Sequence, residues 1–342
     1  MKAVVLHAFG GPEELKVEEL PRPTPGPGEA LVRIRACGVC HLDLIIRLGM
    51  RSRATLPRII GHELSGEIVE VGPAVKDLSP GDRVASFNFQ ACGECVWCRR
   101  GRPSLCYHLQ GDIGQGRHGG YAEYVTLLGA NLVRIPDGLP FEHACLAACC
   151  FAPPYKAIRR VGRIRPGDSV LVTGASGGLG MAAIQIARKC GARTIAITSS
   201  ASKAERVKAA GADEVIVNPD GSFGDDVRRL TGGVGVDLVV ETVGGAVFPA
   251  SLRSLARGGR YVILGELYGK PVELNLALVI VKEWEMYGVQ SASRDDLHEI
   301  LHFMHRTGLT PTIWKTMPLD QAAEAHRQLA NREVVGRIIL TP

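Results

Sequence analysis

Residues 169–180 read SVLVTGASGGLG, an apolar run that leads directly into a glycine-rich loop. A helical pattern follows from Met181 to Cys190. This order of strand, loop and helix is typical of a dinucleotide-binding βαβ unit, because the helix N-terminus attracts phosphate groups. We expect Gly177 to permit a tight turn with close approach of a pyrophosphate, and Gly180 to let the helix pack on the strand.

Strands and helices continue to alternate after this loop. Apolar strands are predicted at 194–198, 214–217, 236–240 and 260–264, and a helix at 201–210. Buried strands that alternate with amphipathic helices indicate a parallel, doubly wound sheet of the Rossmann type. We therefore assign residues 151–290 to an α/β dinucleotide-binding domain. Its predicted cofactor ligands in the loop are Gly174, Ser176, Gly177, Gly178, Leu179 and Gly180.

The end of the second strand indicates which nucleotide is bound. An NAD site carries an acidic residue about twenty residues past the glycine loop, where it bonds the ribose hydroxyls. Here the sequence is Thr-Ser-Ser-Ala-Ser-Lys (198–203), and the first acid is Glu205. Hydroxyls and a lysine accept a 2′-phosphate, which an acid would repel. We expect NADP(H) to be preferred through Ser199, Ser200 and Lys203, with NAD(H) possible; a helix-capping role for Ser200 is compatible with this.

The remaining sequence has a different texture. Short strands are predicted at 30–36, 67–72 and 82–85, separated by turns rich in glycine and proline. This pattern indicates a β-rich, barrel-like domain. A final strand at 336–340 could rejoin it. We assign residues 1–150 and 291–342 to this second, catalytic domain.

Four cysteines have the most specific spacing in the chain. They are Cys92, Cys95, Cys98 and Cys106, within fifteen residues. Four thiolates close a tetrahedral zinc site with no open position, so the site is structural. An iron–sulfur cluster is the rival interpretation.

A second metal site is indicated by Cys40-His41-Leu42-Asp43 together with Gly61-His62-Glu63. A thiolate and an imidazole suit Zn²⁺, and Asp43 and Glu63 are carboxylates of the kind that orient metal ligands. A catalytic zinc needs a third protein ligand. From the residues alone its identity stays open between Cys37, Cys145, Cys149, Cys150, His108 and His118.

These motifs together resemble the zinc-containing medium-chain alcohol dehydrogenase/reductase superfamily. A further matching motif is Gly-Gly-Tyr-Ala-Glu-Tyr at 119–124, and all the motifs follow the family's order along nearly the whole chain. The resemblance implies a GroES-like catalytic domain in which Cys40, His62 and Cys149 hold the catalytic zinc. It also implies that Glu63 can approach the metal, that Asp43 partners His62, and that His41 lies toward the cofactor pyrophosphate.

The activity that the resemblance implies is zinc-dependent hydride transfer between NADP(H) and an alcohol, aldehyde or ketone, in a homodimer or homotetramer with two zinc ions per chain. Two departures from the family pattern matter. Leu42 and Ile45 occupy the positions of a hydroxyl and a histidine that relay a proton, and Pro153-Pro154 replaces small residues beside the nicotinamide. The loop Gly174-Ala175-Ser176-Gly177-Gly178 and the string Cys40-His41-Leu42-Asp43-Leu44 also resemble the quinone-reductase and acryloyl-CoA-reductase-like branches. The alternative function is therefore NADPH-dependent reduction of an activated C=C bond in an enoyl-CoA, enone or quinone.

Composition restricts the other possibilities. The 342 residues are 46% hydrophobic and 22% charged, with a net charge of +5 that is spread along the chain. We therefore expect a soluble two-domain protein with neither a nucleic-acid nor a membrane partner. The N-terminus has no signal-peptide pattern, and ten cysteines suit metal sites or buried thiols in the cytoplasm. A third possibility is a nucleotide-binding protein without turnover.

The substrate is expected to be a small, apolar alcohol or carbonyl compound. Apolar side chains near the predicted metal sites suggest an apolar pocket, although several of them could be ordinary core residues. They are Leu42, Ile45, Phe87, Phe89, Trp97 and Leu109.

Overall fold

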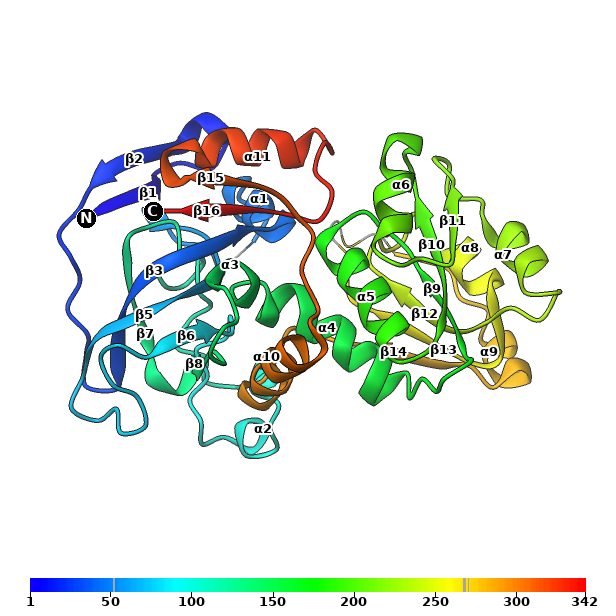
Figure 1. Cartoon of the computed structure of the whole chain (residues 1–342), viewed down its shortest axis with the longest axis horizontal. Coiled ribbons are helices and arrows are strands. Elements are labelled where there is room, and N and C mark those ends of the chain that lie inside the picture. Colours follow the sequence, from blue (N-terminus) through cyan, green and yellow to red (C-terminus); the bar gives the residue numbers. More distant parts are fainter. Residues whose placement is uncertain (52, 267–268, 270) are drawn as a thin grey trace. The chain divides into compact units, whose positions relative to one another are not determined.

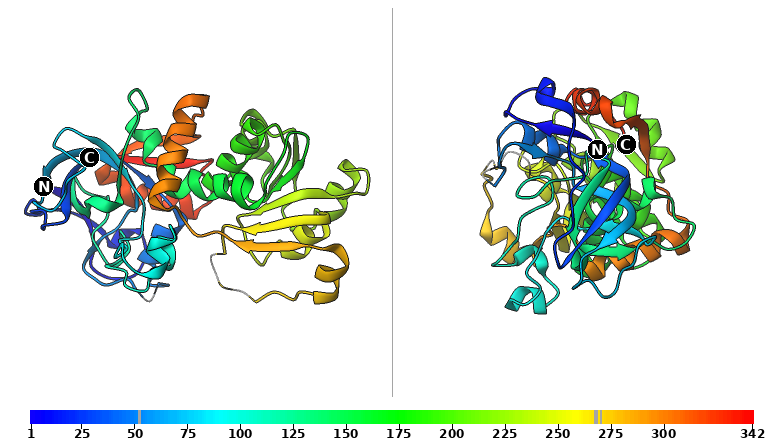
Figure 2. Two further views of the ribbon diagram at one scale, coloured as in Figure 1. Left: turned by 90° about the horizontal axis from the view of Figure 1, so that it is seen from below. Right: turned by 90° about the vertical axis from the view of Figure 1, so that its left-hand side faces the viewer.

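The computed structural model describes residues 1–51, 53–266, 269 and 271–342 (Figure 1). The chain divides into two compact units, one of Met1–Ala152 with Ser291–Pro342 and one of Pro153–Gln290. Both chain ends lie in the first unit (Figure 2). In the described ranges, no helix has both the length and the apolar character that crossing a bilayer requires.

The second unit is built on one six-stranded sheet in the order β11-β10-β9-β12-β13-β14. Every neighbouring pair is parallel. The chain starts at the central strand β9 and winds outward in both directions, which is the doubly wound Rossmann order. The predicted fold class is confirmed. The strands are β9 (Ser169–Val172), β10 (Arg193–Thr198), β11 (Glu214–Val217), β12 (Val236–Glu241), β13 (Leu255–Ile263) and β14 (Glu285–Gly288).

Helices pack on this sheet through apolar faces. Helix α5 (Gly178–Lys189) buries Met181, Ile184 and Ile186 and contacts β9 and β10. It begins three residues before the predicted start, because Gly177 already serves as its N-cap. The other helices of this unit are α6 (Ala201–Ala209), α7 (Gly224–Leu230), α8 (Phe248–Arg253) and α9 (Leu276–Lys282).

The first unit contains the β-rich part of the chain. A seven-stranded sheet has the order β15-β16-β3-β5-β6-β8, with β7 paired to β3, and a smaller sheet has the order β2-β1-β4. The strands are β1 (Lys2–Leu6), β2 (Leu15–Glu19), β3 (Glu29–Val39), β4 (Arg58–Ile59), β5 (Glu63–Val71), β6 (Arg83–Ser86), β7 (Tyr124–Leu128), β8 (Leu132–Arg134), β15 (Ile313–Pro318) and β16 (Arg337–Thr341).

Strand β3 is the centre of this unit. It pairs with β5, β7 and β16, and most of its residues are buried. The predicted strand at 30–36 is therefore confirmed, and along it the more exposed Arg33 and Arg35 alternate with buried Val32, Ile34 and Ala36. The C-terminal strand returns to this unit, with Ile338 opposite Val39 and Leu340 opposite Cys37. This pairing brings residue 337 to the metal-binding end of β3.

The helices of the first unit flank these sheets. They are α1 (His41–Arg47), α2 (Val96–Arg99), α3 (Phe141–Ala144), α10 (Arg294–Thr307) and α11 (Ala322–Ala330). A π-helical turn at Ala147–Phe151 leads into α4 (Ala152–Tyr155), and a second π-helical turn follows at Lys156–Val161. Helix α10 packs against the first of these turns and against β8.

Candidate active site

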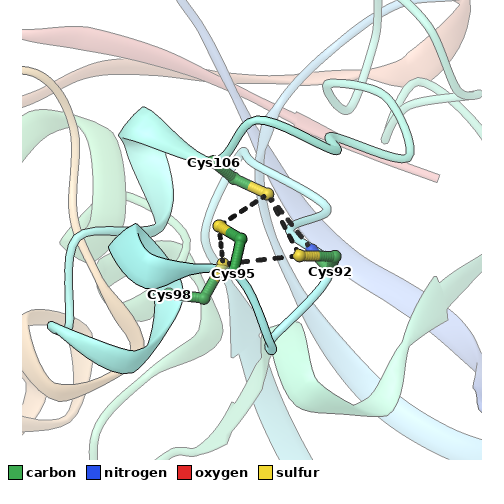
Figure 3. A group of neighbouring side chains, drawn as sticks. All are labelled: Cys92, Cys95, Cys98 and Cys106. Atoms are coloured by element: carbon green, nitrogen blue, oxygen red, sulfur yellow. Dashed lines mark hydrogen bonds between the residues drawn. The ribbon is translucent and has the colours of Figure 1, made fainter.

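The four-cysteine loop forms a closed thiol cluster (Figure 3). Its sulfur–sulfur distances are 3.5 Å for Cys92–Cys106, 3.6 Å for Cys95–Cys98, and 3.9 Å for both Cys92–Cys98 and Cys95–Cys106. Four thiolates at tetrahedral Zn–S distance lie about 3.8 Å apart. The cluster therefore fits one zinc ion, whereas an iron–sulfur cluster is larger than a single ion and needs its thiolates farther apart.

Backbone N–H groups donate hydrogen bonds to sulfur atoms of the cluster. The amides of Cys92 and His108 both donate to Sγ of Cys106, at 3.4 and 3.3 Å. Hydrogen bonds from the backbone of Cys98 and Tyr107 lower the pKa of Cys95 to about 6. Burial and a hydrogen bond to Cys95 instead raise the pKa of Cys98 to about 12, so binding of zinc, which takes thiolates, would displace a proton from the cluster.

The second metal group brings together Cys40, His62, Glu63 and Cys149, whose ligand atoms all lie within 4.8 Å of one another. Cys40 stands between the end of β3 and the start of α1. Cys149 lies in the first π-helical turn. Of the candidates considered for the third ligand, Cys149 joins this group, while Cys37, Cys145, Cys150, His108 and His118 belong to no three-ligand group of the described residues.

Gly61 allows His62 to reach this group. Its φ of +93° lies in the left-handed region, and a Cβ there would come within 2.3 Å of the Tyr121 ring. Only glycine satisfies both conditions. The Gly-His-Glu motif and the Gly-Gly-Tyr motif are therefore two halves of one packed turn, although almost sixty residues separate them in the sequence.

The distances within the group fit zinc. Sγ of Cys149 lies 3.5 Å from Nε2 of His62. A thiolate and an imidazole that share a tetrahedral zinc are expected about 3.6 Å apart. A hydrogen bond from Cys149, followed by the charges of Arg337 and His62, holds the pKa of Cys40 well below its usual value, and the same shared proton raises the pKa of Cys149. With no metal bound, the shared proton therefore lies on Cys149, and zinc binding would displace it.

Asp43 fixes the orientation of His62. Its Oδ1 lies 2.8 Å from Nδ1 of His62, and its Oδ2 accepts from the backbone N–H of Cys40 at 2.9 Å. Both side chains are fully buried. Burial alone opposes protonation of His62, but the Asp43 carboxylate outweighs it and raises the pKa of the imidazole. With Nδ1–H bonded to Asp43, Nε2 is the nitrogen that faces Cys149, and a metal bound there would take the place of the Nε2 proton.

The network continues to residues that the sequence did not single out. The hydroxyl of Tyr121 lies 3.4 Å from Oδ2 of Asp43 and 3.1 Å from Nε2 of His326. Nδ1 of His326 is buried without a hydrogen-bond partner. A buried N–H without an acceptor costs more free energy than a buried lone pair without a donor, so Nδ1 is the unprotonated nitrogen of His326. The Nε2–H of His326 then donates to the Tyr121 hydroxyl, and this hydroxyl donates to Asp43.

Arg337 is, after His326, the second residue near the metal group that no sequence motif marks. Its guanidinium makes a forked contact with Glu63, at 3.1–3.2 Å, and its Nη2 lies 3.6 Å from Sγ of Cys40. Burial raises the pKa of Glu63, and Arg337 acts in the opposite direction. Its only signal in the sequence is an arginine at the start of the last strand, 274 residues from Glu63.

The residues that break the family pattern contribute no polar group here. Leu42 is half-buried and packs against the apolar core, and Ile45 is buried. Phe87 and Phe89 are also buried as core residues, and Trp97 lies under the guanidinium groups of Arg100 and Arg102.

A cavity of about 260 Å³ beside the four-cysteine loop has a mixed lining of Arg53, Cys106, Tyr107, Leu109, Asp112, Gly111 and Gly116. Of the six residues expected to line an apolar pocket, this cavity is lined by Leu109 alone.

The glycine loop of the second unit connects β9 to α5. The turn spans Gly174 to Gly177 and is closed by a hydrogen bond from the Gly177 N–H to the Gly174 carbonyl oxygen at 2.9 Å. The positive φ of +55° lies at Gly174, whereas Gly177 has a φ of −78°. A Cβ on Gly180 would come within 2.4 Å of the Gly174 carbonyl oxygen, so close packing of helix and loop explains Gly180 as expected. Gly177 is exposed at the N-terminus of α5, while Ser176 and Leu179 are half-buried and Gly178 is buried.

Hydroxyl groups gather where β10 ends. Ser199 is exposed, Ser200 is the N-cap residue of α6, and Lys203 is half-buried in the first turn of that helix. The Ser200 hydroxyl makes no capping hydrogen bond and instead lies 2.7 Å from that of Ser202. No acidic residue occurs between Thr198 and Lys203. His41 is the first residue of α1 in the other unit.

Comparison with known proteins agrees with both units. The alcohol dehydrogenase GroES-like domain family matches residues 26–137, and the zinc-binding dehydrogenase family matches residues 178–306. An acryloyl-coenzyme A reductase of Sulfurisphaera tokodaii is 36% identical over the whole of both chains. The crystal structure of AibC superposes with a TM-score of 0.94 at 45% identity, covering 100% of this chain and 96% of that one. A crystal structure of an NAD-dependent alcohol dehydrogenase has a TM-score of 0.92 at 40% identity over both full chains.

These relatives share the GroES-like and nucleotide-binding units, and the two metal groups of this chain fit zinc. The chain therefore belongs to the zinc-containing medium-chain alcohol dehydrogenase/reductase superfamily and is an oxidoreductase.

Proposed function

We propose that this chain transfers a hydride between NADP(H) and an alcohol, aldehyde or ketone. The observation that carries this proposal is the complete group of Cys40, His62 and Cys149, with Asp43 bonded to His62. Bound there, zinc would supply Lewis-acid polarisation of a substrate oxygen, and a nicotinamide would supply or accept the hydride.

The residues around the group prepare it for a neutral substrate. Cys40 and Cys149 as thiolates match the two charges of the ion, and Arg337 matches the charge of Glu63. The Asp43 carboxylate is held by His62, the Cys40 amide and Tyr121, so it is constrained to orient the imidazole. With zinc bound, the charges of the ion and the two thiolates cancel, as do those of Arg337 and Glu63, and the hydrogen-bonded Asp43 carboxylate leaves a net negative charge beside His62.

A second candidate function is the reduction of a C=C bond conjugated to a carbonyl or thioester. Leu42 and Ile45 favour it, because neither side chain can carry a proton to or from a substrate oxygen. In conjugate reduction the hydride adds to the β-carbon and the proton is taken up at the α-carbon, so no relay to the oxygen is needed. Similarity to an acryloyl-coenzyme A reductase over the full length points the same way.

One substrate panel separates these functions. Initial rates with NADPH would be measured for matched sets of aldehydes, ketones, enones and enoyl thioesters, and product analysis would distinguish alcohol from saturated carbonyl. Turnover of simple aldehydes or ketones to alcohols supports the first proposal. Turnover restricted to conjugated substrates, with the carbonyl unchanged, replaces it with the second.

We further propose that NADP(H) is the preferred cofactor. The support is the hydroxyl-rich end of β10 with Lys203 and no nearby acid. NADPH should bind more tightly than NADH, and Lys203→Ala should narrow the difference, because a charge-assisted bond to the 2′-phosphate is lost. Lys208→Ala, on the same helix, is the matched control. Equal affinities of the wild type for the two cofactors would refute the preference.

The oligomeric state and the cellular location of the protein are two further proposals. We propose a homodimer or homotetramer that assembles through the nucleotide-binding unit, in the cytoplasm. β14 is the edge strand of the parallel sheet, and the neighbouring helix α9 exposes Leu276, Ile280 and Val281 by 68%, 75% and 62%. An apolar helix beside an open strand edge is suited to a second copy of the same surface. All ten cysteines are free thiols, which suits a reducing compartment.

A further inference from the structure

Helix α10 carries a histidine pair outside both metal groups. Its sequence at 298–302 is His-Glu-Ile-Leu-His. Residues four apart lie on the same face of a helix, one turn above each other. The rings of His298 and His302 are close together, with centroids 4.4 Å apart and planes inclined by 53°. The spacing therefore places two imidazoles side by side on one helix face.

Capping and packing fix the backbone of the helix that carries the two rings. At its start, the Ser293 hydroxyl accepts from the Asp296 N–H at 3.1 Å, and the Asp296 carboxylate accepts from the Ser293 N–H at 2.9 Å. At its end, Gly308 has the left-handed conformation with a φ of +62°. The opposite face is anchored by four buried side chains, which are Leu297, Ile300, Leu301 and Met304. A helix of fourteen residues fixed at both ends and along one face is a rigid support.

The surroundings favour a neutral ring at His302. Burial, and then the positive charges of His298, Arg306 and His305, lower the pKa of His302. Two protonated rings at this distance would repel each other, whereas neutral rings offer lone pairs that one cation can share.

We propose that His298 and His302 form a third metal site, which binds a first-row divalent transition cation such as Zn²⁺ or Ni²⁺ through two imidazole nitrogens. The site lies on the helix surface: His298 is exposed and His302 is half-buried. The His-Glu-x-x-His pattern also occurs in zinc peptidases, but these need a third protein ligand. Within the described residues, the pair belongs to no group of three ligands, so the inferred role is binding and not hydrolysis.

The test uses untagged, zinc-loaded protein and Ni²⁺ alone as the probe. Equilibrium dialysis should give about one Ni²⁺ per chain, since imidazole nitrogens suit nickel, with the original zinc retained. His298→Ala and His302→Ala should each abolish this binding as fully as the double variant, because a chelate needs both rings. Such strong non-additivity distinguishes one shared site from two independent histidines.

Two further variants keep the proposal falsifiable. His305→Ala removes an exposed histidine of the same helix and should leave Ni²⁺ binding intact. His298→Ala with Arg306→His should restore binding, because His302 and residue 306 regain the four-residue spacing. The proposal is overturned if the double variant still binds Ni²⁺, if the two single losses add, or if His305→Ala abolishes binding while His298→Ala does not.

Discussion

Arg337 and Glu63 form a buried ion pair beside Cys40, with side-chain exposures of 7% and 0%. Removing one partner of such a pair leaves an uncompensated charge in a poorly solvated place. Arg337→Met should therefore lower the free energy of unfolding by about 3–5 kcal/mol, measured by denaturant titration at neutral pH. The double variant Arg337→Met, Glu63→Gln should recover much of this loss. A double variant no more stable than Arg337→Met would show that the charge is not the cause.

His326 provides a pH-dependent test of the buried network. Burial lowers its pKa to about 4, below the ordinary value of 6.5. Between these values the unfolded chain binds the proton and the folded chain does not, so stability falls as pH drops from about 6.5 toward 4. His326→Gln keeps a donor for Tyr121 but cannot titrate.

Over that pH range the wild type should lose about 3 kcal/mol more unfolding free energy than His326→Gln. Unfolding titrations of both proteins at matched pH values measure the difference. Parallel curves for the two proteins would mean that His326 does not titrate in this way.

The sequence identified some site residues and could not identify others. Cys40 and His62 lie in short local motifs, and Cys149 was chosen through family resemblance among several cysteines. Arg337 and His326 act on partners 274 and 205 residues away, and no local pattern marks them. Their roles depend on how β16 and α11 fold back onto the first unit, which a single sequence does not encode locally.

At the scale of elements, the four-cysteine loop can be tested separately from the second metal group. Cys92→Ser removes one of four thiolates, so the loop should lose its zinc and its fixed conformation. The second metal group draws no ligand from this loop and should keep its zinc. Metal analysis together with limited proteolysis within residues 92–106 measures both effects. Loss of both zinc ions from Cys92→Ser would mean that the two sites are not independent.

The glycine loop shows that the sequence predicts the order of the elements but not which glycine takes the positive φ. The sequence predicts strand, loop and helix in the correct order, and Gly177 closes the turn, but the residue with the positive φ is Gly174. Several neighbouring glycines satisfy the same pattern, and only the backbone shows that Gly174 takes the positive φ. Helix α10, the support of the His298–His302 pair, was not predicted, although Ser293 and Gly308 mark its two ends.

At the scale of the whole molecule, the change from β-rich to alternating texture corresponds to two compact units. Self-association is the main prediction at this level. Ile280 is 75% exposed in the single chain, so Ile280→Glu should cost little folding stability but disrupt an interface over α9. Sedimentation velocity should show a smaller species for this variant. Val234→Glu, at a residue that is 68% exposed outside α9, is the control and should leave assembly unchanged. A monomeric wild type would refute the assembly.

The central claim is that Cys40, His62 and Cys149 hold a zinc ion that the reaction requires. Zinc content per chain, measured beside NADPH-dependent turnover for wild type and Cys149→Ser, tests it most directly. We predict about two zinc ions per wild-type chain, and about one in Cys149→Ser, with turnover lost and NADPH affinity unchanged. One zinc per wild-type chain that disappears with Cys92→Ser, or full turnover by Cys149→Ser, would contradict the account.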